Sequence, residues 1–197
     1  MSNMAVNFEI PWKRYALIAE IVQRFHQTNH RLGKTALQKM IFLLQRTFKV
    51  DVPYKYTLYT YGPYCSDVAR DLDLIERFGG AQVLYDSGVG GYEIQPGPAN
   101  QEMRERFNDF LDTIAPQLDA LVSGFGGFNA KELELRSTII YLAKPGLSRE
   151  ELIQQVHDVK PHFTLQTITN ALRELESTGY VTPSASVSNR QSGSSAC

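Results

Sequence analysis

The feature that most constrains the fold is a run of apolar residues at helical spacing near the C-terminus, within residues 131–183. Leu135, Ile139 and Leu142 are spaced i, i+4 and i+7, so they fall on one face of a first predicted helix. Pro145-Gly146 follows, and this dipeptide is typical of a turn. The pattern therefore predicts a helix that ends before the Pro-Gly pair.

Two further helices are predicted by their capping residues. Ser148 stands three residues before Glu151, which is the spacing of a capping box, and the helix that starts there should end before Pro161. Thr164 is the predicted N-cap of the third helix, and Tyr180-Val181-Thr182 predicts a short strand after it. The apolar stripe of the third helix consists of Leu165, Ile168, Leu172 and Leu175. Three helices and a strand are the order of a winged-helix unit, in which the third helix lies in the major groove of DNA.

The N-terminal half has a comparable order of expected elements. These are helices at 12–27 and about 35–48, a strand or extended arm at 52–61 broken by Gly62-Pro63, a helix after an N-cap at Ser66, and a β-hairpin formed by 82–85 and 91–94. Residues 100–122 follow as one long helix, which Pro116 should kink or split in two.

These elements predict a mainly α (α+β) protein with tandem winged-helix, helix-turn-helix-like modules and small β wings. The predicted organisation is an N-terminal winged-helix-like module at 1–97, a connecting helix and glycine-rich joint at 98–130, a C-terminal winged-helix module at 131–183, and a disordered, serine-rich tail at 184–197.

Charge is distributed unevenly along the chain, although the net charge is only −1. Residues 1–55 carry nine Lys or Arg and three Asp or Glu, whereas residues 56–130 carry four and eleven. Segments of opposite sign either attract each other within one fold or leave a basic face for phosphate. Both alternatives stay open from the sequence.

No apolar run reaches the ~20 residues that a membrane-spanning helix needs, and the N-terminus lacks the pattern of a signal peptide. The expectation is a cytoplasmic protein without a membrane partner. The two cysteines, Cys65 and Cys197, lie far apart, which argues against a disulfide framework or a cysteine zinc site.

Residues with catalytic potential do not form a recognisable motif. Gly33-Lys34-Thr35 resembles the end of a phosphate-binding loop, but position 28 is Thr28 rather than the required glycine. His26 and His30 have a spacing that suits a metal, yet no carboxylate or cysteine completes the set. Cys65 precedes a predicted helix without a nearby histidine. We therefore expect no enzyme activity, no cofactor, no metal and no small-molecule substrate.

Two sets of residues are candidates for binding a macromolecule. The candidate nucleic-acid-binding residues are Lys34, Lys39, Arg46, Lys160, His162, Gln166, Thr167, Asn170 and Arg173. In this set, Lys and Arg would contact phosphates, while residues 162–173 would contact bases. The candidate protein-binding residues are Tyr59, Tyr61, Gly62, Pro63 and Tyr64.

The tyrosines in the second set belong to a crowded segment. On a strand, Tyr54 and Tyr56 would point to one side, and Tyr59 and Tyr61 to the other. Only one side can be fully buried, so the other side either packs between the two modules or forms a protein-binding patch.

Two segments resemble a known family. Residues 35–44, which contain Leu37-Gln38-Lys39, and Tyr61-Gly62-Pro63-Tyr64 followed by residues 67–74, resemble the LQK and YGPY segments of the YwgA-like family. They are more loosely similar to Panacea-type antitoxin domains. Cys65 stands where the family usually has serine. The YwgA-like resemblance implies a helix-turn-helix-like fold; the Panacea-type resemblance implies binding and neutralising a toxin protein.

The leading hypothesis from the sequence is a non-enzymatic regulator that binds DNA as a winged-helix transcription factor, with a homodimer as the binding form. The alternative is a protein-interaction, antitoxin-like module that binds and neutralises a partner protein.

Overall fold

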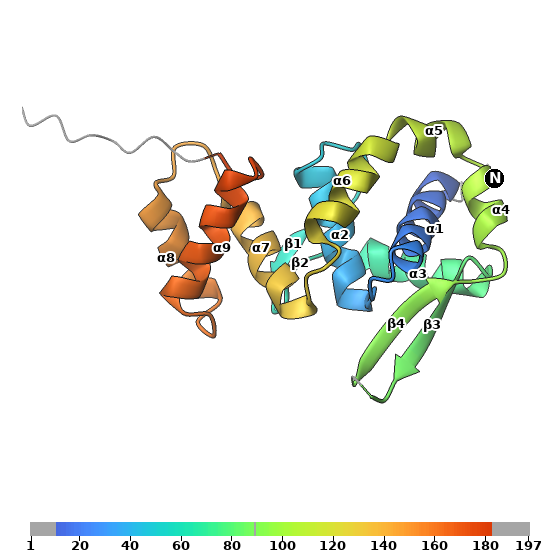
Figure 1. Ribbon diagram of the computed structural model, residues 1–197, viewed down its shortest axis with the longest axis horizontal. Coiled ribbons are helices and arrows are strands. Elements are labelled where there is room, and N and C mark those ends of the chain that lie inside the picture. Colours follow the sequence, from blue (N-terminus) through green and yellow to red (C-terminus); the bar gives the residue numbers. More distant parts are fainter. Residues whose placement is uncertain (1–10, 89, 183–197) are drawn as a thin grey trace, which may run out of the picture. The chain divides into compact units, whose positions relative to one another are not determined.

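The computed structural model describes residues 11–88 and 90–182 and is mainly helical, with two small antiparallel sheets among these residues (Figure 1). The chain divides into two compact units, Met1–Glu134 and Leu135–Cys197. The tail expected at 184–197 lies outside the described residues. No helix within the described ranges is both long and apolar enough to cross a membrane.

The core of the first unit is built on its first two helices. α1 (Trp12–Gln27) has the bounds that the sequence predicts, and α2 (Lys34–Arg46) lies within one or two residues of its expected range. The central residues of both helices are buried, including Ile18 and Ile41. α1 contacts α3 (Ser66–Arg77), so these helices form the layer on which the rest of the unit packs.

The segment expected as one long helix is three helices: α4 (Asn100–Glu105), α5 (Asn108–Thr113) and α6 (Ala115–Phe125). The breaks fall at Phe107 and Ile114, which have non-helical backbone angles. Pro116 lies in the first turn of α6, where its missing N–H costs nothing. The prediction of one helix or two halves is therefore wrong. The bends let α4 and α5 contact α1 and let α6 contact both α1 and α2, so this segment belongs to the first compact unit.

Both sheets of the first unit are two-stranded hairpins. The expected hairpin is present as β3 (Ala81–Asp86) and β4 (Gly91–Pro96), which extends away from the helices of the unit (Figure 1). A second, shorter hairpin consists of β1 (Thr57–Tyr59) and β2 (Gly62–Tyr64).

Gly62-Pro63 was expected to break a strand, and instead it lies in β2. Gly62 has φ 88, a left-handed backbone that glycine adopts without steric cost, and it directly follows the turn. Pro63 is tolerated because a strand with one neighbour does not need every N–H. The pair therefore reverses the chain rather than ending its β structure.

The second unit contains the end of α7 (Ala130–Leu142), together with α8 (Arg149–Val159) and α9 (Leu165–Ser177). The predicted capping box of α8 is confirmed, since Glu151 N donates to Ser148 Oγ and Ser148 N donates to Glu151 Oε2. The predicted N-cap of α9 is also confirmed, because Thr164 accepts from Thr167 N.

Two expectations for this unit are wrong. Leu165 is 47% exposed, because it is the first residue of α9 and precedes the stripe that packs inward. Residues 180–182 form no strand. Gly179 has φ 74, and the N–H groups of Tyr180 and Val181 both donate to the Leu175 carbonyl, so the chain folds back onto the end of α9.

Candidate functional site

Two segments that are far apart in sequence meet through buried hydrogen bonds. Gln38 Nε2 donates to the Cys65 carbonyl at 2.9 Å, and the Cys65 N–H donates to Gln38 Oε1 at 3.0 Å. Lys39 Nζ donates to the Pro63 carbonyl at 2.7 Å. Gln38 and Lys39 are only 6% and 2% exposed. These side chains of α2 therefore hold the β2 segment in a fixed position.

The same bonds determine how α3 begins. Ser66 was expected to be the N-cap, but Cys65 occupies that position and makes no side-chain capping bond. Cys65 is 3% exposed, so its thiol packs in the core. The amide of Gln38 takes the place of a strand neighbour for the Cys65 backbone, which fixes the entry into α3.

A groove of about 450 Å³ lies where α2, α3 and the β1–β2 hairpin converge. Its apolar residues include Leu37, Val68 and Leu72, all of which are buried. The remaining residues that line it are Lys34, Thr35, Gln38, Lys39, Tyr59, Tyr61, Gly62, Tyr64, Ala69 and Asp73. We call this the α2–α3 groove. Its size and its mixture of apolar, aromatic and a few polar groups are those of a binding site.

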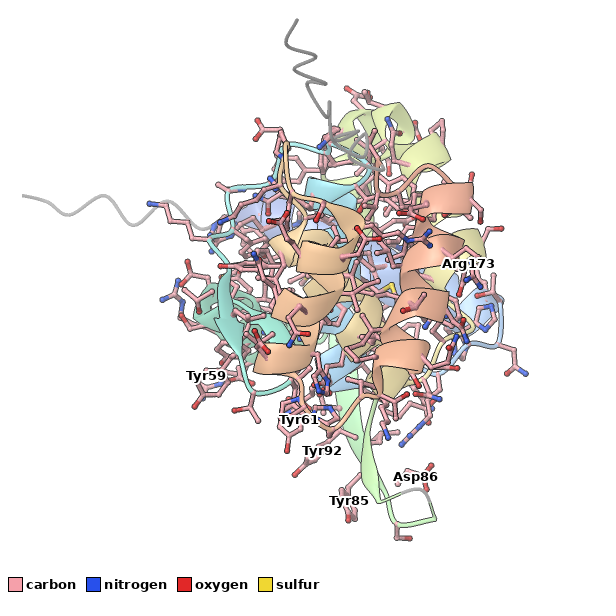
Figure 2. All side chains as sticks on the ribbon, turned by 90° about the vertical axis from the view of Figure 1, so that its left-hand side faces the viewer. Tyr59, Tyr61, Tyr85, Asp86, Tyr92 and Arg173 are labelled. Carbon is pink, nitrogen blue, oxygen red and sulfur yellow. The ribbon has the colours of Figure 1, made fainter. Side chains whose placement is uncertain are left out.

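Tyrosines form the hairpin side of the α2–α3 groove. Tyr59 and Tyr61 are 66% and 64% exposed, and both point outward from the hairpin (Figure 2). Tyr64 packs against Tyr59 with ring centroids 5.9 Å apart. Tyr54 is buried, and the sequence predicts burial for one of the two sets of tyrosines in this segment. However, Tyr54 and Tyr56 precede β1, so their direction comes from tertiary contacts rather than from strand alternation.

Tyr54 belongs to a buried polar network that supports the groove from behind. Asp71 of α3 accepts from Arg14 at 2.9 Å and from the Tyr54 hydroxyl at 2.8 Å. Burial raises the pKa of the Asp71 carboxyl, although the Tyr54 hydroxyl and the Arg14 guanidinium oppose that rise. Burial, followed by the neighbouring Asp71 carboxylate, raises the pKa of the Tyr54 hydroxyl well above its ordinary range. The network ties α1 and α3 to the chain that leads into β1.

A second aromatic surface adjoins the groove at Lys34. The Lys34 ammonium lies 4.6 Å from the centroid of the Tyr92 ring, and Tyr92 packs edge-on against Tyr85 at 5.4 Å. Tyr85 and Tyr92 are 63% and 49% exposed on the β3–β4 hairpin (Figure 2). Lys34 therefore joins the α2–α3 groove to a pair of tyrosines that the sequence analysis did not select.

The structure corrects two of the candidate nucleic-acid-binding residues. Lys39 and Lys160 are each 2% exposed, so neither presents its ammonium group to a phosphate. Lys39 was expected to contact phosphate, but β2 covers it and its ammonium donates to the Pro63 carbonyl. Lys34 and Arg46 are exposed, as expected.

The remaining candidates lie on the exposed side of α9 or just before it: His162, Gln166, Thr167, Asn170 and Arg173. Gln166 donates to Asn170 Oδ1 at 2.9 Å, and Arg173 lies 3.4 Å from the same oxygen, so these side chains form a polar row (Figure 2 labels Arg173). Glu174 and Glu176, which follow them in sequence, form ion pairs with Arg136 and Arg149.

Within residues 11–88 and 90–182, no three His, Cys, Asp or Glu side chains come together in a way that could hold a metal ion. Lys34 and Thr35, which resemble the end of a phosphate loop in sequence, form the first turn of α2. No protein-family model matches the chain, and no curated protein matches its sequence.

The tyrosines of the groove were predicted from the sequence as binding residues, but its apolar floor and the role of Gln38 were not. One signal for the buried contacts of Gln38 and Lys39 was present in the sequence. Gln38 and Lys39 are polar residues next to Leu37, Met40 and Ile41 in a helix that is otherwise apolar on that side. Their partners could not be identified, because β2 lies more than twenty residues further along the chain.

Proposed function

We propose that the chain is a non-enzymatic protein-interaction module that binds a segment of a partner protein in the α2–α3 groove. The single observation that supports this most strongly is a groove with an apolar floor and strongly exposed tyrosines at its edge. Tyrosine is enriched at protein interfaces, because its ring supplies a large contact area with few rotatable bonds.

The groove is also held in shape before any partner arrives. Gln38 and Lys39 bind the backbone of the β2 segment, and Asp71 anchors α3 to α1. A binding surface that is already ordered loses less conformational entropy on association, which favours affinity. The resemblance to Panacea-type domains supports the same class of function, in which the partner would be a toxin that this chain neutralises.

Paired substitutions of exposed tyrosines test this proposal. Tyr61 and Tyr85 are almost equally exposed, but only Tyr61 lines the groove. In affinity purification from native extract, we expect wild type and Tyr85→Ala to retain the same partner. Tyr61→Ala should weaken binding by about tenfold or more, as for an interface hot spot. Because both side chains are exposed, both variants should fold normally, which circular dichroism checks. Equal partner recovery with both variants, or no partner at all, contradicts the proposal.

A second candidate function is DNA binding by a helix-turn-helix-like arrangement of α8 and α9, with a dimer as the binding form. The observation in its favour is the exposed row of Gln166, Asn170 and Arg173 along α9. Gln and Asn side chains pair with adenine and Arg pairs with guanine. This candidate has less support, because Lys160 is buried and Arg136 and Arg149 are paired with carboxylates, which leaves few cations for phosphates.

The test is fluorescence anisotropy with a random-sequence duplex pool at about 50 mM salt. If this candidate is correct, Arg173→Ala should weaken binding by about 1–3 kcal/mol, whereas Lys144→Ala, which removes an exposed cation outside α9, should change it less. Absence of binding at this low salt concentration rules the candidate out.

A further inference from the structure

The charge around the α2–α3 groove indicates which kind of segment it binds. The sequence contains no Asp or Glu between Glu20 and Asp51, a stretch that includes the whole of α2. The exposed cation of this stretch that lines the groove is Lys34. Within the described part of the chain, Lys34 contacts the face of the Tyr92 ring but has no carboxylate partner.

A second cation lies close to Lys34. Among the described residues, Arg31 makes long contacts, 3.7 Å to Asp86 Oδ2 and 3.5 Å to the Gly91 carbonyl, and its side chain is 39% exposed. Gly91 precedes Tyr92, the residue on which Lys34 stacks. The positive charge on the α2 side of the groove is therefore that of Lys34, which lies next to the Arg31–Asp86 pair.

The α3 side of the groove has the opposite sign. Asp73 lines the groove and is exposed, and it has no ion-pair partner within the described residues. Asp67, in the first turn of α3, is paired with Arg70 at 2.8 Å. A negative group on a ligand would therefore be repelled from the α3 side and attracted to Lys34.

We infer that the occupant of the α2–α3 groove is an acidic peptide segment of a partner protein, in which a carboxylate stands beside apolar or aromatic side chains. The carboxylate pairs with the Lys34 ammonium, and the neighbouring apolar side chain enters the groove towards Leu37, Val68 and Leu72. The Tyr92 ring lies against the Lys34 ammonium, 4.6 Å from its centroid, and supports it at this end of the groove. This inference rests on the proposed function and specifies the chemistry of the partner.

The test begins with an unbiased probe. A phage-displayed random-peptide library is selected on the immobilised full chain, and bound phage are counter-selected on Tyr61→Ala, so that only peptides that need the groove remain. We expect the remaining sequences to be enriched in Asp or Glu next to Leu, Phe, Tyr or Trp. Enrichment in Lys or Arg, or no preference for acidic residues, overturns the inference.

A matched pair of charge reversals then locates the carboxylate. Lys34 and Lys13 are both exposed lysines that lie over an aromatic ring, at 4.6 Å from Tyr92 and 4.2 Å from Phe110. A selected peptide, synthesised with a fluorescent label, should bind Lys34→Glu about tenfold more weakly than wild type and bind Lys13→Glu unchanged. Replacing its acidic residue with the corresponding amide should weaken binding to wild type but strengthen binding to Lys34→Glu, because it removes the repulsion between two carboxylates.

The outcomes separate this inference from the proposed function. Peptides that need Tyr61 but carry no acidic residue, or that bind Lys34→Glu as tightly as wild type, overturn the inference and leave the protein-binding groove in place. Failure to select any peptide that needs Tyr61 overturns both.

Discussion

At the scale of single residues, Gln38 does most to shape the candidate site. Its amide both donates to and accepts from the backbone of Cys65, twenty-seven residues away. A buried backbone N–H and C=O need partners, and the Gln38 amide supplies one to each of these groups of Cys65. The position of the Tyr61-Gly62-Pro63-Tyr64 segment, and with it the tyrosine edge of the groove, therefore depends on Gln38 together with Lys39, which binds the Pro63 carbonyl.

Replacing Gln38 should destabilise the protein strongly. Gln38→Leu keeps the side-chain size but leaves two buried backbone groups unpaired, so we expect a loss of about 2–4 kcal/mol in the free energy of unfolding. Gln45→Leu is the matched control. Among the described residues, Gln45 makes one bond, to the Tyr54 carbonyl at 3.1 Å, and its Oε1 has no partner, so its loss should cost about 1 kcal/mol. Urea unfolding measures the free energy of unfolding of both variants. Equal losses of stability would contradict the role that we assign to Gln38.

At the scale of secondary-structure elements, local signals fixed helix starts better than helix lengths. The caps at Ser148 and Thr164 act within one turn of their own helices, so the sequence was sufficient to predict them. The breaks between α4, α5 and α6 lie where the chain bends around α1, and no proline or glycine marks the break at Phe107. A capping signal is therefore local, whereas a break inside a helical segment depends on packing.

The capping box of α8 should make stability depend on pH. The backbone N–H and the hydroxyl of Ser148 lower the pKa of the Glu151 carboxyl from its usual 4.5. A lowered pKa in the folded state means that the ionised carboxylate stabilises the fold at neutral pH. This stabilisation is lost as the pH falls below about 5 and through the folded-state pKa.

Thermal melts of wild type and Glu151→Gln, recorded from neutral pH to about pH 3, test this expectation. Wild type should be more stable at neutral pH, and the difference should disappear in acid. Glu150→Gln, which neutralises a neighbouring carboxyl that makes no capping bond, serves as the control for losing one negative charge in the same turn. A difference between wild type and Glu151→Gln that does not change with pH argues against the capping role.

At the scale of the whole molecule, ion pairs inside the first unit account for much of the charge asymmetry of the sequence. Arg14, Arg24 and Arg31 from the basic segment pair with Asp71, Asp119 and Asp86 from the acidic one, and Arg104 pairs with Glu20. Of the two alternatives left open by the sequence, attraction between the segments accounts for these cations. This is why the basic N-terminal segment gives little support to DNA binding.

Part of the candidate site could be predicted from the sequence, and part of it could not. The sequence was enough to select Tyr59 and Tyr61 as candidate binding residues, but strand alternation does not explain their exposure, because Tyr61 lies in the turn after β1. The sequence was not enough to show that Lys39 is covered by β2 or that Lys160 is buried, since both depend on contacts outside their own helices. Periodicity gives the side of a helix on which a residue lies, but it does not show which neighbour covers that side.

The sequence by itself determined the helical character of the chain, the bounds of α1, the β3–β4 hairpin and the caps of α8 and α9, because these features depend on residues within a few positions of one another. Only the tertiary structure decided that Gly62-Pro63 lies in a strand, that the segment after residue 98 packs on α1 and α2, and that residues 180–182 form no strand. It also decided that a groove exists between α2, α3 and β1–β2. The physical reason is that each of these outcomes depends on partners distant in sequence, and one chain gives no local signal of which distant segments will meet.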